Sequence, residues 1–162
     1  MSQRFSTDVL IIGGGAAGLA AALHLADTAR VTVLAKGEPS SGSSFWAQGG
    51  IAAVLDEADS FAFHEADTVK AGADLCDIET VRLIVREAPD VVKELSNWGV
   101  DFDKEDNQLH LTMEGGHSHR RVAHVADATG REITQKLSER VLDHHNIEIF
   151  HDRMAIDLIN LN

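Results

Sequence analysis

The fold is decided near the start of the chain by the stretch Val9-Leu10-Ile11-Ile12-Gly13-Gly14-Gly15-Ala16-Ala17-Gly18. Its four apolar residues predict a buried strand, and a G-x-G-x-x-G turn follows directly on them. An Ala/Leu helix over Leu19–Leu25 and a second apolar strand over Val31–Leu34 come next. Strand, turn, helix and strand therefore fit within about thirty residues, as a βαβ unit requires.

Each glycine of this turn has a physical role in holding a dinucleotide. Gly13 allows the tight turn, Gly15 lets the backbone approach a pyrophosphate, and Gly18 lets the helix pack on its strand. The helix N-terminus adds free N–H groups and a partial positive charge that attract phosphates. The sequence therefore predicts a dinucleotide site at Gly13, Gly14, Gly15, Ala16, Ala17 and Gly18. The alternative is a glycine-rich turn that binds nothing.

The stretch from Val9 to Ala26 is almost free of charge and close to the length of a membrane span. Asp8 at its front edge and His24 within it argue against a transmembrane or signal segment, as does the glycine cluster in its middle. No convincing cleavage site follows. We therefore expect neither a membrane anchor nor a targeting peptide.

Composition is typical of a globular protein, with 44% hydrophobic and 25% charged residues among 162. The formal charge of −12, from 14 Lys and Arg against 26 Asp and Glu, disfavours nucleic acid and anionic membranes as partners. The single cysteine, Cys76, excludes an internal disulfide framework, and a reducing cytoplasm is the expected location. Its neighbours Leu75 and Ile78 favour a buried structural thiol over a nucleophile.

Helical spacing of apolar residues predicts further helices over Ser60–Ala71, Asp77–Trp98 and Gly130–His144. The first is expected to turn Phe63, Ala66 and Val69 inward. Pro89 is expected to break or kink the second, opening a new helix at its first turn, and Gly99 to end it.

Ile147–Phe150 is predicted to be the third strand of the sheet, and Leu109 and Leu111 mark a possible short strand. Ala155–Leu161 resembles the start of another strand, whose backbone groups would lack a partner. Residues 1–162 are therefore predicted to be the N-terminal part of a larger α/β nucleotide-binding domain. Its parallel sheet would be incomplete at the C-terminal end.

The end of the second strand does not match a standard NAD site. Such a site places Asp or Glu there to accept hydrogen bonds from the ribose, but the chain has Ala35 followed by Lys36. Glu38 lies beyond Gly37, in the polar loop that runs to Ser44. The departure weakens the assignment of NAD as the cofactor.

A second motif indicates a flavin: Ser43-Ser44-Phe45-Trp46-Ala47-Gln48-Gly49-Gly50-Ile51-Ala52. Its hydroxyls, amide and small-residue backbone suit an anionic cofactor and a flavin edge that both donates and accepts hydrogen bonds. An ordinary Ser/Gly surface loop would not explain the apolar residues Phe45 and Trp46 within it.

Together these motifs resemble the flavoprotein family of fumarate reductase, succinate dehydrogenase and L-aspartate oxidase, whose FAD loop reads S-x-x-x-A-Q-G-G. Three further segments carry the resemblance along nearly the whole chain: His64-x-x-Asp67-Thr68-x-x-Ala71-Gly72, Glu114-Gly115-Gly116-His117-Ser118-His119-Arg120-Arg121 and Ala126-Asp127-Ala128-Thr129-Gly130-Arg131. Within the family, the motifs are most similar to those of the aspartate oxidases.

The resemblance implies a Rossmann-like FAD-binding domain, with a substrate cap and C-terminal helical domains outside this chain. It implies FAD contacts at Lys36, Ser43, Ser44, Phe45, Trp46, Ala47, Gln48, Gly49 and Gly50 besides the glycine turn. Fumarate reductases and succinate dehydrogenases carry a histidine that bonds covalently to the flavin, and Ser43 stands at that position here. Non-covalent FAD is therefore expected.

The implied activity is oxidation of L-aspartate to iminoaspartate, with oxygen or fumarate as electron acceptor and quinolinate synthase as pathway partner in NAD biosynthesis. By the same resemblance Glu114 orients the substrate through its ammonium group, while no catalytic acid or base lies in this chain. The alternatives are a fumarate reductase-like dehydrogenase and a nucleotide-binding module without catalysis.

The run from His117 to Arg121 leaves three interpretations open. Its cationic groups could face the flavin or a dicarboxylate, or form a solvated basic strand with no role. The H-x-H spacing could also suggest zinc, but no cysteine or carboxylate pair accompanies it at ligand spacing, and no metal is expected.

Overall fold

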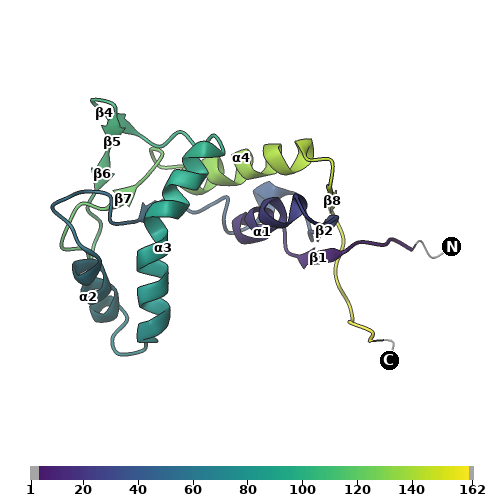
Figure 1. The fold of residues 1–162 in the computed structure, drawn as a ribbon, viewed down its shortest axis with the longest axis horizontal. Helices are drawn as coiled ribbons and strands as arrows, with labels where there is room; N and C mark the ends of the chain where they lie inside the picture. Colours follow the sequence, from purple (N-terminus) through teal and green to yellow (C-terminus); the bar gives the residue numbers. More distant parts are fainter. Residues whose placement is uncertain (1–3, 161–162) are drawn as a thin grey trace. The chain divides into compact units, whose positions relative to one another are not determined.

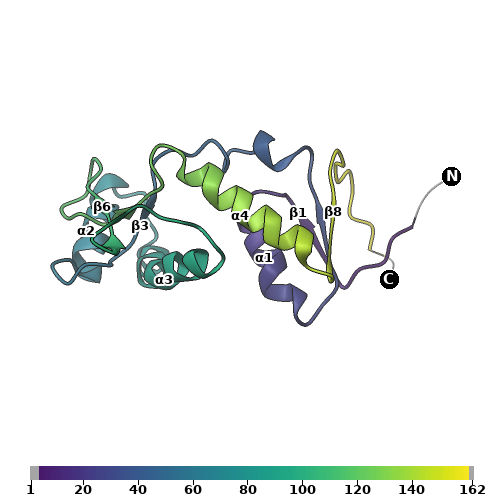
Figure 2. The ribbon, with the colours of Figure 1, turned by 90° about the horizontal axis from the view of Figure 1, so that it is seen from above.

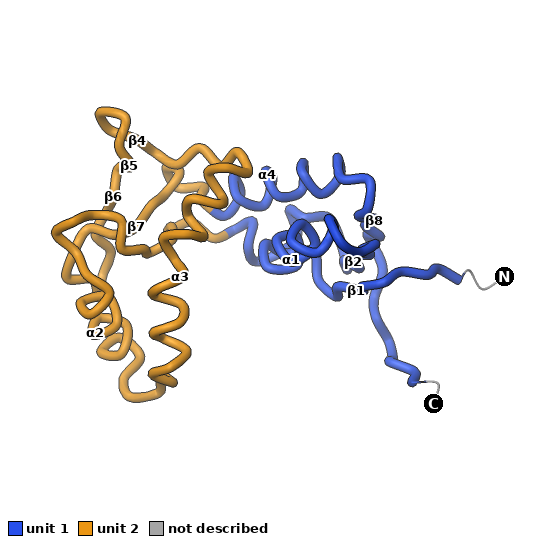
Figure 3. The backbone as a smooth tube through the Cα atoms, in the orientation of Figure 1, with its two compact units in different colours: residues 1–46, 130–162 blue, residues 47–129 orange. Residues whose placement is uncertain are grey.

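A computed structural model describes residues 4–160 of the chain. The chain divides into two compact units, one made of residues 1–46 and 130–162 and the other of residues 47–129 (Figure 3). We call them unit 1 and unit 2 and describe each by itself.

Unit 1 contains the predicted βαβ unit. Three parallel strands form its sheet in the order β1-β2-β8, with bounds Val9–Ile12, Val31–Leu34 and Ile147–Phe150. Helix α1 (Ala16–Ala26) packs on β1 and β2, and Leu19 and Ala22 on its inner side are fully buried (Figure 1). Val31 and Val33 lie buried in the central strand, and the predicted parallel sheet and its third strand are confirmed. The prediction that β1 is buried is wrong, because Leu10 and Ile12 are 48% and 66% exposed. The unit also contains a short 3-10 helix, Pro39–Ser41, and all of α4 (Thr129–Asp143) except its first residue.

Unit 2 contains two long helices and two small antiparallel sheets. Helices α2 (Phe61–Ala71) and α3 (Ile78–Asn97) pack side by side (Figure 1, Figure 2). Strands β3 (Ile51–Ala52), β7 (Val122–Ala123) and β6 (Leu111–Thr112) form one sheet, and β4 (Lys104–Glu105) pairs with β5 (Gln108–Leu109) in the other. None of the helices within residues 4–160 combines the length and apolar character needed to cross a membrane.

The predicted break at Pro89 is wrong, because α3 continues through it as one helix. Proline removes one backbone hydrogen bond, but α3 has buried apolar residues on both sides of that point, including Val85 and Val92. Because these residues are packed on both sides of Pro89, the two halves remain one helix. Asp77 begins the helix by accepting the N–H of Thr80 at 2.8 Å.

Three smaller predictions are also wrong. In α2 the buried residue is His64, whose ring lies 5.9 Å from that of His117, whereas Phe63 is 51% exposed, Ala66 is exposed and Val69 is only partly buried. Residues 155–160 form no strand, since no neighbouring strand pairs with them, and Leu161 lies outside the described residues. Cys76 is only partly buried, with its Sγ 3.7 Å from the carbonyl oxygen of Thr68, and Leu75 beside it is 92% exposed.

The possible strand around Leu109 and Leu111 exists as two separate strands, β5 and β6. His110 lies between them, and its backbone N–H donates to the carbonyl of Asp103 at 2.8 Å. This bond turns the chain from one short sheet into the other.

Candidate cofactor site and the Arg121 cluster

A pocket of about 600 Å³ opens at the carboxyl ends of β1 and β2, where open α/β sheets bind nucleotides. Its lining belongs entirely to unit 1: Ile12, Gly13, Gly14, Gly15, Leu34, Ala35, Lys36, Gly37, Glu38, Pro39, Ser41, Gly42, Ser43, Arg153, Met154 and Ala155. The pocket therefore includes the first three glycines of the predicted turn together with Lys36 and Ser43.

The glycine turn is shaped by contacts that side chains would block. Gly13 has φ +123°, a conformation that other residues rarely adopt. A Cβ on Gly18 would collide with the carbonyl oxygen of Gly13, so glycine there allows α1 to lie close against β1. A Cβ on Gly15 would meet Oγ of Ser44 at 3.2 Å, so the space between Gly15 and Ser44 is narrow as well.

Ser44 joins the second motif to the glycine turn. Its Oγ accepts the backbone N–H of Ala16, the first residue of α1, at 3.3 Å. Helix α1 has no side-chain cap of its own, and the N–H groups of Ala17 and Gly18 have no partners within the helix. A dinucleotide pyrophosphate requires a glycine with positive φ, a backbone that it can approach closely, and free amides in the first turn of a helix. Gly13, Gly15 and the start of α1 have these features, so the residues present fit the ADP part of FAD.

Arg153 lines the same pocket and was not anticipated from the sequence. Its backbone N–H donates to the carbonyl of Ala35 at 3.0 Å, which holds the segment after β8 beside the end of β2. Residue 152, Asp152, has φ +55° and turns the chain toward the pocket. Two cations, Lys36 and Arg153, thus line a pocket that contains one carboxylate, Glu38.

The rest of the second motif is divided between the units. In unit 1, the ring of Phe45 lies below the guanidinium of Arg131 at 5.5 Å and beside Trp46, which is 66% exposed. In unit 2, a Cβ on Gly50 would meet the carbonyl oxygen of Ala123 at 2.6 Å, so glycine is needed for packing on β7. Oγ1 of Thr129 donates to the carbonyl of Gly49 at 3.3 Å. Ala47 and Gln48 are exposed.

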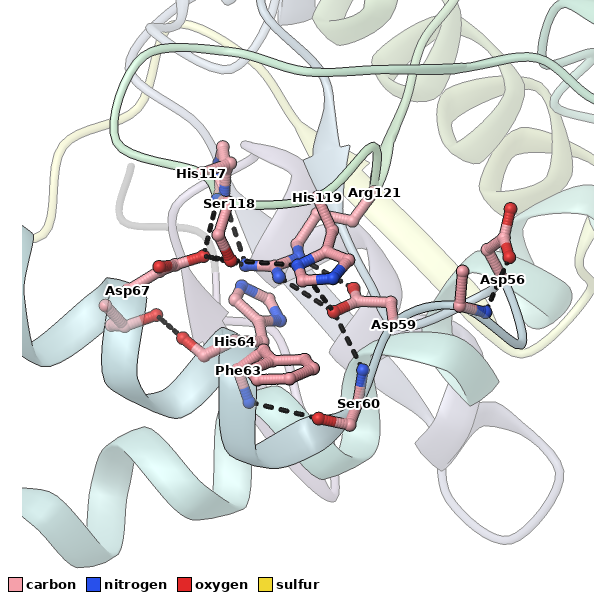
Figure 4. Close-up of polar contacts among 12 residues, drawn as sticks. Asp56, Asp59, Ser60, Phe63, His64, Asp67, His117, Ser118, His119 and Arg121 are labelled. Carbon is pink, nitrogen blue, oxygen red and sulfur yellow. Dashed lines mark hydrogen bonds and ion pairs between the residues drawn. The ribbon is translucent and has the colours of Figure 1, made fainter.

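Unit 2 contains a buried ion cluster centred on Arg121, whose side chain is 0% exposed. Its Nε and Nη2 donate to the two carboxylate oxygens of Asp59, both at 2.8 Å, and Nη1 donates to Asp67 at 2.7 Å (Figure 4). The same oxygen of Asp67 accepts the backbone N–H and the hydroxyl of Ser118, each at 2.7 Å. We call Asp59, Asp67, Ser118 and Arg121 the Arg121 cluster.

The cluster changes the ionisation of its members. Burial raises the pKa of Asp67, but hydrogen bonds from Ser118 and then Arg121 outweigh it and lower that pKa to about 2. Burial likewise opposes ionisation of Asp59, and the bidentate contact with Arg121 still lowers its pKa. Burial lowers the pKa of His64, as does the nearby charge of Arg121, so this imidazole is held neutral. Nδ1 of His64 is buried without a hydrogen-bond partner among the described residues.

The Arg121 cluster tests one interpretation of the run from His117 to Arg121, the solvated basic strand. A solvated strand is wrong for Arg121, which is fully buried, and its charge is already balanced by two carboxylates. His119 stacks on Phe63 with ring centroids 4.7 Å apart. Arg120 is exposed, and within residues 4–160 no group of three or more His, Cys, Asp or Glu is arranged to hold a metal. Arg121 therefore stabilises the loop that carries Glu114.

Glu114 lies on an exposed turn between β6 and β7. The backbone N–H of His117 donates to its carbonyl at 3.2 Å, and Gly116 has φ +91° within the turn. The far end of the turn is held by Ser118 and Arg121 of the Arg121 cluster. A carboxylate is thus presented on a loop with a fixed attachment.

Residues 8–162 match a protein family described as the FAD binding domain. L-aspartate oxidase of Vibrio cholerae is 50% identical over 158 residues, which cover 94% of this chain and 30% of that protein. L-aspartate oxidase of Yersinia pestis is 50% identical over 166 residues, covering 99% of this chain and 31% of that protein. The chain thus spans under a third of the length of these relatives.

A solved structure of E. coli quinol fumarate reductase is also similar to this chain. It superposes with a TM-score of 0.89 at 32% sequence identity, covering 93% of this chain and 26% of the other. The similarity therefore includes the backbone fold as well as the sequence.

Proposed function

This chain belongs to the FAD-binding domain family, and we propose that it supplies the nucleotide-binding part of an enzyme that oxidises L-aspartate to iminoaspartate. The observation that carries the cofactor assignment is the unit 1 pocket, which Lys36 and the first three glycines of the turn line together, Gly13 among them with a positive φ. The relatives that are 50% identical are L-aspartate oxidases, which supports the choice of substrate.

FAD, when bound, supplies a two-electron acceptor for the Cα–H bond of L-aspartate, and oxygen or fumarate takes up those electrons afterwards. The residues of this chain bind the cofactor and orient the substrate. Gly15 and the first turn of α1 hold the pyrophosphate, and Ser44 keeps the turn in shape through the N–H of Ala16. Because Ser43 offers a hydroxyl and not an imidazole, the cofactor is held without a covalent bond.

Glu114 gives the enzyme its preference for an amino acid. L-aspartate and fumarate both have two carboxylates, but only aspartate has an ammonium group. A carboxylate near such a substrate is unfavourable unless it meets a positive charge, and the ammonium supplies one. Glu114 therefore binds that ammonium and turns the Cα–H bond toward the acceptor.

The Glu114→Gln variant of the full-length protein tests this function. Loss of one partner of a desolvated charge pair costs roughly 2–5 kcal/mol, so kcat/KM for L-aspartate should fall by about two orders of magnitude. Fumarate reduction should change much less, because fumarate has no ammonium to lose. Glu87→Gln, which alters an exposed carboxylate on α3, is the matched control. Equal losses with both substrates would contradict the role of Glu114.

A fumarate reductase-like dehydrogenase is the second candidate, favoured by the superposition at 32% identity. It would reduce fumarate without oxidising L-aspartate, and acid precipitation would leave flavin in the washed pellet if the bond were covalent. A protein that binds FAD but turns over neither substrate would instead be a binding module.

With aspartate oxidation established, the product would be consumed by quinolinate synthase in NAD biosynthesis.

A further inference from the structure

Arg121 has one more neighbour besides its carboxylates. Its Nη1 lies 3.4 Å from Nδ1 of His117. Burial lowers the pKa of Arg121, but hydrogen bonds to Asp59 and Asp67 outweigh this and raise it, so the guanidinium stays charged. A guanidinium has donors and no acceptor. Nδ1 of His117 must therefore accept, and the ring proton of the neutral imidazole must lie on Nε2.

The tautomer leaves Nε2–H of His117 as a free donor. No group within residues 4–160 accepts from it, and the nearest ring, that of His64, meets His117 edge to face at 5.9 Å. His117 is only partly buried, and Nε2 is not among the polar atoms that are shut off without a partner. A hydrogen-bond donor of fixed position is thus open to an incoming acceptor.

His117 lies on the same turn as Glu114, to whose carbonyl its backbone N–H donates at 3.2 Å. The two residues between them, Gly115 and Gly116, have no side chains that could cover the turn. One short turn therefore presents a carboxylate and, three residues later, an N–H donor. These are the complements of the ammonium and the carboxylate of an amino acid.

We propose that His117 binds a carboxylate of the substrate through Nε2–H, so that one turn recognises the ammonium group and one of the two carboxylates of a dicarboxylic amino acid. The Arg121 cluster acts as the positioning element, because Arg121 fixes the tautomer of His117 while Asp59 and Asp67 keep Arg121 buried and charged. The inference rests on the proposed function, since it assigns the substrate's second contact on the Glu114 turn.

The test measures the binding of succinate to the full-length holoenzyme through the change in flavin absorbance. Succinate is a dicarboxylate without an ammonium group. His117→Leu removes the donor and should weaken succinate binding about ten- to a hundredfold. His117→Gln can place an amide N–H near the position of Nε2 and should restore most of the affinity. His145→Leu alters an exposed histidine and is the matched control, expected to bind succinate as wild type does.

Unchanged binding by His117→Leu, or equal losses in His117→Leu and His117→Gln, would overturn the role of His117 while leaving the proposed function standing. A wild-type holoenzyme that binds no dicarboxylate would overturn both. If His117→Leu fails to fold, the ¹⁵N NMR spectrum of the wild-type protein with labelled histidine rings still tests the role of His117. The inference requires the proton on Nε2 and a shift of that nitrogen when succinate is added, and a proton on Nδ1 would refute it.

Discussion

Removing one carboxylate from the Arg121 cluster should destabilise unit 2 severely. The side chain of Asp59 is 1% exposed and meets a guanidinium that is 0% exposed through two contacts of 2.8 Å. Asp59→Asn cancels its charge and turns an amide N–H toward Arg121, which leaves that cation with one carboxylate, Asp67. Breaking a buried pair in this way costs roughly 3–5 kcal/mol, a large share of the stability of an ordinary domain.

The matched control is an equally short ion pair on the surface. Arg82 and Glu79 lie 2.7 Å apart, but their side chains are 48% and 81% exposed, so Glu79→Gln should cost less than about 0.5 kcal/mol. Urea denaturation of the 162-residue chain in a Trp46→Phe background reports unit 2 through Trp98, the other tryptophan of that sequence, at the end of α3. Equal losses in the two variants would refute the reasoning, because burial would then contribute nothing.

Two further predictions concern pH and packing. Since the pKa of Asp67 is lowered to about 2, its stabilising contribution should be complete above about pH 4 and lost as the pH falls toward about 2. Asp67→Asn should flatten the urea-derived free energy of unfolding across that window, and an unchanged slope would contradict the assignment. Gly18→Ala should lower the stability of unit 1 by roughly 1–3 kcal/mol, because the added Cβ would collide with the carbonyl of Gly13. Thermal denaturation followed by circular dichroism checks this, and a variant as stable as wild type would show that α1 can shift away from β1.

The local parts of the fold could be predicted because their signals are local. Apolar runs bounded by glycine and polar residues gave β1, β2 and β8, and the parallel pairing followed from the βαβ spacing. The predicted break at Pro89 does not occur, because proline propensity acts on one hydrogen bond, whereas burial of Val85 and Val92 acts on both sides of it. Tertiary packing therefore decided that element.

The Arg121 cluster could not be predicted in full, because its partners lie 54 and 62 residues away in the sequence. Asp67 belonged to a recognisable motif with His64, but Asp59 carried no signal of its own. A buried arginine needs compensating carboxylates. Asp59 and Asp67, which lie before and after the first turn of α2, were therefore the signal from which the cluster could have been predicted. Arg153 was missed because residues 155–160 were expected to continue as a strand, whereas the chain turns into the pocket at Asp152.

Binding of FAD to the full-length apoprotein, followed by flavin fluorescence, tests the central claim most directly when wild type is compared with Gly15→Val. A Cβ at Gly15 meets Oγ of Ser44 at 3.2 Å, so the folded turn can adjust, but the branched side chain would fill the approach needed by the pyrophosphate. Leu142→Ala, at a position that is 69% exposed on α4, is the control and should bind as wild type does. The account predicts tight binding by wild type and none by a folded Gly15→Val protein. Equal FAD affinity in the two would contradict it.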